Sequence, residues 1–146
     1  KMDNSTITSA NSVFTIVVAG LFPSPVQLKG YASDKAFTTE AVDLAEVQMG
    51  VDGRMTAGYV PNPTKQTVTL QADSPSKDIF AAIVQAMKTA REVFYISGSI
   101  SLPSTGESFT LTRGVLTNAK QIPDAQKVLQ PVDYVITWES VNRSLL

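Results

Sequence analysis

The side chains of this chain that could carry chemistry are carboxylates, because the sequence contains neither cysteine nor histidine. Without thiolates and imidazoles, Ser–His and Cys–His catalysis, the usual zinc sites and a histidine pH switch are excluded. Paired carboxylates can still act as acid and base or bind a hard cation, but no spacing here matches a cation-binding loop. We therefore predict no catalytic residue, no cofactor and no metal, and a protein that is not an enzyme. The carboxylates considered are Asp52, Asp73, Asp78, Glu107, Asp124, Asp133 and Glu139.

The composition gives no sign of strong nucleic-acid binding or of a membrane-spanning segment. The chain has 12 basic and 13 acidic residues, a net charge of −1, and no basic run. The longest apolar run, residues 13–22, is interrupted by Thr15 and Gly20 and is too short to span a membrane. At 146 residues we expect one domain, residues 12–146. Residues 1–11 are polar and are expected to form an arm that is flexible or ordered by a partner.

The elements that must position these side chains are clearest in residues 46–72, where the residue types specify backbone geometry. A two-residue turn would split the apolar residues of this stretch across two faces. A three-residue loop of residues 51–53 pairs Met49 with Met55 and puts the whole set on one face. The last position of such a loop is left-handed, and Gly53 adopts it without a Cβ penalty. We therefore predict a hairpin with a three-residue loop and a glycine bulge, and an apolar face made of Val47, Met49, Met55, Ala57 and Tyr59.

One amphipathic helix is predicted over residues 77–92. Ser74 can cap it with Pro75 at the first helical position, and Ser76 is the alternative cap. We expect its apolar face to pack against the core rather than to form a groove for a partner. That face consists of Ile79, Phe80, Ile83, Val84, Met87 and Ala90.

The chain before residue 46 and after residue 92 is dominated by strand patterns. Residues 12–19 are apolar on both faces, which predicts burial on both sides. The segment Phe22-Pro23-Ser24-Pro25 is expected to end that strand. Residues 121–131 are predicted to form a loop, with a short helical turn at residues 124–130 as the alternative. Further strands are expected over residues 66–72, 94–102, 108–115 and 132–140, with Phe109, Leu111 and Val115 on one face.

Neighbouring strands are joined by turns that are too short for parallel crossovers. The sheet should therefore be mostly antiparallel. The predicted fold class is mainly β, an antiparallel β-barrel or β-sandwich of about seven strands flanked by one central α-helix.

Three of the predicted strands have a face that is rich in hydroxyl groups and poor in charge. Such a face suits a lumen past which DNA slides without sticking, because few cations contact the phosphates. It suits the solvent side of an ordinary antiparallel sheet equally well, and both interpretations stay open. The faces are Thr67/Thr69/Gln71, Ser97/Ser99/Ser101 and Ser108/Thr110/Thr112.

In order and spacing, these elements resemble the tail tube proteins of contractile-tailed bacteriophages (myophages), whose fold is shared by the Hcp proteins of type VI secretion. The similarity covers residues 12–140, and the stretch of residues 109–123 contributes to it. The motifs that carry it are Met49, Val51-Asp52-Gly53, Val68-Thr69-Leu70, Ser74-Pro75 before the helix, and the closing Trp138-Glu139.

The resemblance implies a structural protein of the virion, made in the host cytoplasm. Its copies would self-assemble into hexameric rings whose strands join into a continuous inner barrel. Stacked rings would form the tube through which genomic DNA is ejected without specific binding. Tail sheath, baseplate and tail terminator proteins are the implied partners. In such tubes an extended hairpin reaches the adjacent ring, and here that contact carries over to Asp52, Gly53, Arg54 and Met55.

Two alternatives accompany this interpretation. A baseplate or tube-initiator protein of the same fold would have the same elements. A monomeric β-sandwich that binds a carbohydrate or a small ligand would need exposed aromatic side chains, for which Tyr134 and Trp138 are candidates. Val132 and Ile136 share their face and favour a position in the core instead.

Overall fold

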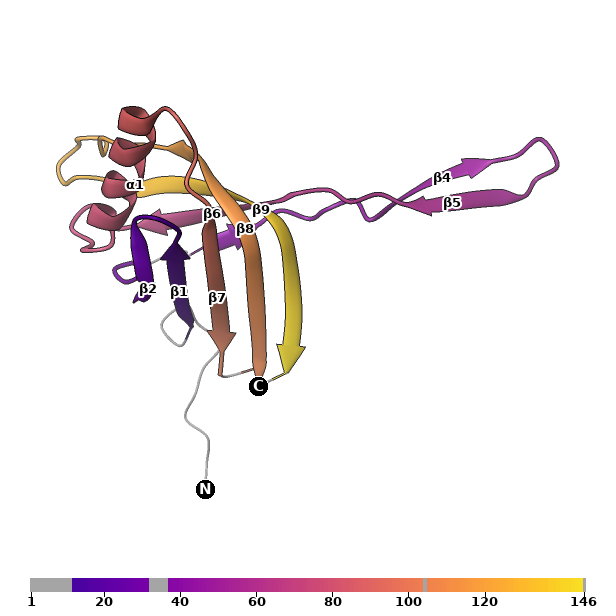
Figure 1. The fold of residues 1–146 in the computed structure, drawn as a ribbon, viewed down its shortest axis with the longest axis horizontal. Coiled ribbons are helices and arrows are strands. Elements are labelled where there is room, and N and C mark those ends of the chain that lie inside the picture. The colour runs from indigo at the N-terminus through magenta and orange to yellow at the C-terminus, as the bar shows by residue number, and fades with distance from the viewer. Residues whose placement is uncertain (1–11, 32–36, 104, 146) are drawn as a thin grey trace, which may run out of the picture.

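The computed structural model describes residues 12–31, 37–103 and 105–145 (Figure 1). The arm predicted for residues 1–11 lies outside them. The described residues form one helix and nine strands: β1 (Val13–Val18), β2 (Phe22–Gln27), β3 (Phe37–Thr39), β4 (Ala45–Met49), β5 (Met55–Tyr59), β6 (Thr64–Leu70), α1 (Lys77–Ala90), β7 (Ile96–Leu102), β8 (Glu107–Ala119) and β9 (Val132–Leu145).

Seven of the strands form one curved sheet in the order β2-β1-β7-β8-β9-β6-β3, and β4 pairs with β5 in a sheet of their own. Every pairing is antiparallel. The helix lies at one end of the large sheet, and the β4–β5 hairpin projects from the other side of the body (Figure 1). The predicted fold class, mainly β and antiparallel with one helix, is confirmed.

The segment Phe22-Pro23-Ser24-Pro25, expected to end the first strand, instead begins β2 at the edge of the sheet. An edge strand tolerates proline because one of its sides needs no N–H donors. The prediction that the first strand is buried on both faces is also wrong. Phe14 is buried, but Val13 on the opposite face is 38% exposed, because no described element covers that face.

A bulge in β8 changes which side chains enter the core. Gly98 lies opposite Leu111 and Ile96 lies opposite Gly114, so two residues of β8 face one residue of β7. Arg113 in this bulge has a φ of 51°, a left-handed conformation. The extra residue reverses the alternation beyond it, as bulges do. Leu116 is therefore buried, and the prediction that Val115 shares a face with Phe109 and Leu111 is wrong.

The core forms around Trp138, which is fully buried in the centre of β9. Its indole Nε1 donates a hydrogen bond of 2.9 Å to the side-chain oxygen of Gln66 on β6. The ring of Phe80 on α1 stacks on Tyr134 at 4.4 Å between centroids. Packing of the helix against the sheet is thus the role of its apolar face, as predicted.

The helix starts at Lys77, and Ser76 is its N-cap residue. The Ser76 hydroxyl accepts a 2.7 Å hydrogen bond from the Lys29 N–H instead of capping the helix, and the Ser74 hydroxyl donates to the Lys29 carbonyl at 2.5 Å. The two serines therefore fasten the start of the helix to the chain that follows β2. The helix ends where Arg91 takes a left-handed φ of 56°.

Candidate functional site: a projecting hairpin, a free strand edge and a hydroxyl face

The β4–β5 hairpin has the predicted loop. Met49 pairs with Met55, and the Gly50 N–H donates to the Arg54 carbonyl at 2.7 Å. The three residues between Gly50 and Arg54 form the loop, in which Gly53 has a φ of 81°. The Asp52 carboxylate accepts a 3.0 Å hydrogen bond from the Arg54 N–H, so its role is in the turn. The register that puts the odd-numbered residues on one face is confirmed.

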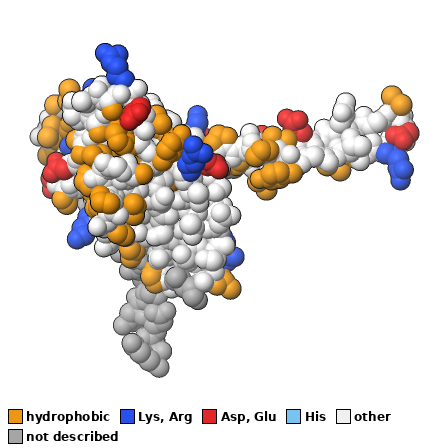
Figure 2. Space-filling model, viewed as in Figure 1, with side chains coloured by type: hydrophobic (Ala, Val, Ile, Leu, Met, Phe, Trp, Pro, Cys, Tyr) orange, Lys and Arg blue, Asp and Glu red, His pale blue; other side chains and the backbone are white. Residues whose placement is uncertain are grey.

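The apolar face of this hairpin is uncovered. Met49 is 65% exposed and Met55 is 60% exposed, and Val47 and Tyr59 are exposed on the same face. Figure 2 shows apolar side chains along the projecting arm, away from the body of the molecule. A two-stranded hairpin alone in water is marginally stable. Contiguous exposed apolar surface of this kind marks an interaction site, so the hairpin is the first candidate for function.

A second feature is the open edge of β9. Its pairing with β8 continues as far as Leu145, which lies opposite Glu107. Its pairing with β6 stops at Trp138, which lies opposite Thr64. Residues 139–145 therefore have no strand on their second side within the described part of the chain. An unpaired edge of this length can accept a strand from another molecule.

The two outermost strands are poorer acceptors. β2 contains Pro23 and Pro25, which have no N–H to donate to a neighbour. β3 is only three residues long. The edge of β9 is therefore the best place in the described sheet for pairing between chains.

The outer face of β1, β7, β8 and β9 is lined mainly by hydroxyl and amide side chains, with Val13 and Val17 of β1 beside them. One row across the sheet runs from Thr15 through Ser99 and Thr110 to Asn142. The hydroxyls of Thr15 and Ser99 lie 2.9 Å apart within it. The lower part of the body in Figure 2 is correspondingly almost free of charged side chains. The full set is Thr15, Ser97, Ser99, Ser101, Ser108, Thr110, Thr112, Ser140, Asn142 and Ser144.

The third predicted polar face does not belong to this surface. Thr69 on β6 is buried, and its hydroxyl donates a 2.6 Å hydrogen bond to Asp133. β6 lies on the far side of β9 from β8.

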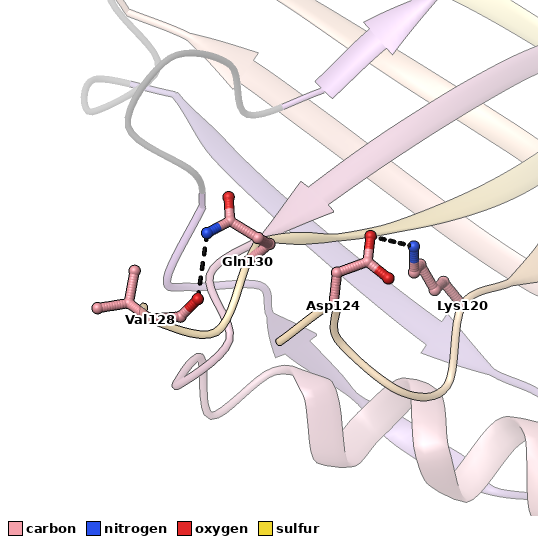
Figure 3. Close-up of polar contacts among 4 residues, drawn as sticks. All are labelled: Lys120, Asp124, Val128 and Gln130. Atoms are coloured by element: carbon pink, nitrogen blue, oxygen red, sulfur yellow. Dashed lines mark hydrogen bonds and ion pairs between the residues drawn. The ribbon is translucent and has the colours of Figure 1, made fainter. Parts of the chain in front are cut away.

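The carboxylates are dispersed and mostly paired. Asp124 lies 2.7 Å from the Lys120 ammonium in the loop beside the helix (Figure 3). Glu139 lies 3.6 Å from Arg113, whose guanidinium stacks 4.4 Å from the Tyr95 ring centroid. Hydrogen bonds from Arg143 and Thr105 lower the pKa of Glu107. In the described ranges no three acidic residues come together as metal ligands do, and no helix is long and apolar enough to cross a membrane.

The structure also shows surface apolar residues for which the sequence analysis predicted only a loop. Ile122, Val128 and Leu129 are exposed in the segment between β8 and β9. A short bridge between Ala125 and Leu129 orders this segment, so the alternative of a helical turn at residues 124–130 is wrong. The available signal was the presence of large apolar residues between Pro123 and Pro131.

Three solved structures, from an anti-feeding prophage and from an extracellular contractile injection system, share this fold. The anti-feeding prophage cap, described as a tube terminating cap, has a TM-score of 0.64 at 13% identity, over 100% of this chain and 95% of that one. A chain of the PVC sheath-tube complex in the extended state has a TM-score of 0.62 at 10% identity, over 98% of this chain and 94% of that one. A chain of the anti-feeding prophage baseplate, 6-fold symmetrised, has a TM-score of 0.60 at 6% identity, over 98% of this chain and 97% of that one.

The fold, with its projecting hairpin, is one that is found in chains of the anti-feeding prophage and of an extracellular contractile injection system. The chain belongs to the family described as tail fiber protein gp32, whose model matches residues 5–142. The structural neighbours show the fold alone, because their identities are low. A comparison with curated protein sequences gives no significant match.

Proposed function

We propose that this chain is a non-enzymatic tail tube subunit that self-assembles into hexameric rings, and that the rings stack into the conduit for DNA ejection. The observation that carries the proposal is the projecting hairpin. It exposes Met49 and Met55 on an apolar face that the described part of its own chain leaves uncovered. In the proposed tube, Asp52, Gly53, Arg54 and Met55 contact the adjacent ring.

Ring closure is the role proposed for the free edge of β9. Pairing with a neighbour would supply the hydrogen bonds that residues 139–145 lack on one side. Such a contact joins two different edges of identical subunits, and it closes into a ring when the rotation between them allows.

The hydroxyl face is proposed to line the lumen. Serine, threonine and asparagine side chains give the phosphates no cation to bind, so DNA passes with little retention. Sheath, baseplate and terminator proteins are the proposed partners, in line with the assemblies in which the similar structures were solved.

A second candidate is a baseplate or initiator protein of the same fold. It is favoured by the family description, which names a tail fiber, and by the baseplate and cap among the similar structures. Such a protein would form one ring of limited stacking rather than a long tube. The monomeric binding module loses its candidate aromatics, because Tyr134 and Trp138 are buried.

Light scattering over a range of protein concentrations, with negative-stain images of the same samples, tests the proposal. Hexameric rings that stack into tubes are the expected result. Single rings would favour the baseplate or initiator candidate. A monomer at every concentration, also in the presence of preformed tail baseplates, would contradict both.

A further inference from the structure

Apart from Leu145, the large apolar side chains of the described chain that are more than half exposed gather in two segments. One is the hairpin, and the other is the segment of residues 120–131, here called the acceptor loop. Within the acceptor loop Ile122 is 79% exposed, Val128 is 70% exposed and Leu129 is 56% exposed. Burying a large apolar side chain is favourable because it removes apolar surface from water. Both segments therefore gain most from contact with another apolar surface.

The acceptor loop is an ordered platform. The Gln130 N–H donates to the Asp124 carbonyl at 2.9 Å, and the Gln130 amide donates to the Val128 carbonyl at 3.1 Å (Figure 3). The ion pair between Lys120 and Asp124 closes the other side of the loop. Val128 and Leu129 line a shallow, mostly apolar groove of about 480 Å³ together with Gln71, Ala72, Asp73 and Pro131. A side chain from another molecule can enter it without displacing a described element.

The hairpin cannot fill the groove of its own chain. The hairpin projects from one side of the body, whereas the acceptor loop lies beside α1 on the other side (Figure 1). A contact between them must join two copies, and it is heterologous because it uses two different surfaces. Heterologous contacts repeat from copy to copy, which is the geometry that an assembly of many subunits requires.

The charges of the two segments are complementary. Residues 43–59 carry the three carboxylates Asp43, Glu46 and Asp52 against the single cation Arg54. The acceptor loop carries Lys120 and Lys127 against Asp124. Asp73 also lines the groove, so the docking surface as a whole is close to neutral. Lys120 and Lys127 attract the net negative hairpin, whereas two hairpins repel each other.

We propose that the acceptor loop is the surface on which the hairpin of a second copy docks, with Met49 and Met55 against Val128 and Leu129. The inference rests on the proposed self-assembly and adds the surface that receives the hairpin. Methionine suits this contact because its unbranched, flexible side chain fills irregular grooves.

Disulfide trapping tests the contact directly, because the chain contains no cysteine that could compete. Met55→Cys is introduced in one batch of full-length chain and Leu129→Cys in another, and the two are mixed under assembly conditions and oxidised. Two cysteines bridge only when their Cα atoms lie within about 7 Å. The pair Met49→Cys and Val128→Cys serves as a second test should either first variant misfold. Met55→Cys with Val93→Cys is the control, because Val93 is an exposed apolar residue that lies outside both the acceptor loop and the edge of β9.

The expected result is a mixed dimer of the Met55→Cys and Leu129→Cys chains in several-fold excess over either homodimer and over the control pair. Rings or tubes in the images without this mixed dimer would overturn the docking inference and leave the proposed function standing. The absence of both assembly and crosslink, with folded monomers, would overturn the two together.

Discussion

At the scale of single residues, Gly114 determines how Trp138 packs. A Cβ atom at position 114 would lie 2.4 Å from Cε3 of the indole, far inside contact distance. We predict that Gly114→Ala lowers the free energy of unfolding by about 1–3 kcal/mol, the usual cost of overpacking a core. Urea denaturation followed by tryptophan fluorescence measures it, because Trp138 is the one tryptophan of the chain.

Gly58→Ala is the matched control for this change. Gly58 lies in β5, and a Cβ atom there would meet nothing within 4 Å. A loss of stability for Gly58→Ala as large as that for Gly114→Ala would show that contact with Trp138 is not the cause.

The pair of Glu107 and Arg143 predicts a dependence of stability on pH. Hydrogen bonding to Arg143, and then to Thr105, lowers the pKa of Glu107 below its ordinary value of 4.5. A carboxyl with a lowered folded-state pKa stabilises the fold above its unfolded pKa, and this contribution is lost as the pH falls through the folded-state pKa. Stability curves of the wild type and Glu107→Gln should therefore differ above the ordinary pKa of 4.5 and converge as the pH falls through the lowered folded-state pKa. A constant difference across that range would contradict the assignment.

Residues also show where sequence reasoning works and where it fails. The loop at Gly53 was predictable because its requirements are local: a left-handed position, a glycine to fill it and apolar residues in a fixed register on both sides. The bulge at Arg113 was not, because arginine gives no local signal for a left-handed φ. Its conformation is held by the pairing of β8 with two different neighbours and by contacts with Tyr95 and Glu139.

At the scale of elements, the hairpin should fold and function separately from the core. Gly53 has a φ of 81° with open space around it, so Gly53→Val strains the loop without a clash. A β-branched residue in this conformation costs about 1–3 kcal/mol. This cost destabilises the hairpin and leaves the core unchanged. We predict that the thermal midpoint of the monomer stays nearly unchanged while ring stacking is lost, as measured by calorimetry and by sedimentation of assembled material.

Gly53→Asn is the comparison for this prediction, because asparagine tolerates the left-handed region. It should stack almost as the wild type does. Normal assembly of Gly53→Val would refute a role of the loop in stacking.

Elements with strong hydrophobic periodicity and short connections were predictable from the sequence. Strands that form only because a neighbouring strand pairs with them were not. The helix α1 follows its pattern, and β6 overlaps the strand predicted over residues 66–72, although Thr69 of its predicted polar face is buried. β2 was missed because two prolines normally argue against a strand, and only its position at the edge of the sheet permits them. The last residues of β9, up to Leu145, have a weak pattern and are extended through pairing with β8.

At the scale of the whole molecule, the hydroxyl-rich outer face, which carries few charges, predicts weak retention of DNA. In a ring each substitution is repeated in every subunit, so Ser99→Lys with Thr110→Lys would add a belt of cations to the proposed lumen. We predict that assembled wild-type protein retains no double-stranded DNA in filter binding, whereas the double variant retains it with an affinity that falls steeply as salt rises. Gln85→Lys with Thr89→Lys, at two exposed positions of α1, is the control and should increase DNA retention much less.

The separation of the hairpin from the body also has a kinetic consequence. A two-stranded sheet with little support opens often, so its amide hydrogens should exchange with solvent far faster than those of β8 and β9. The hairpin of each incoming copy loses conformational entropy as it docks. Contacts offset this loss only when a receiving surface is already in place. Free copies should accordingly start new assemblies slowly and extend existing ones quickly. Assembly would then start mainly on a surface that is already formed, and the number of such starting surfaces would control how many assemblies form.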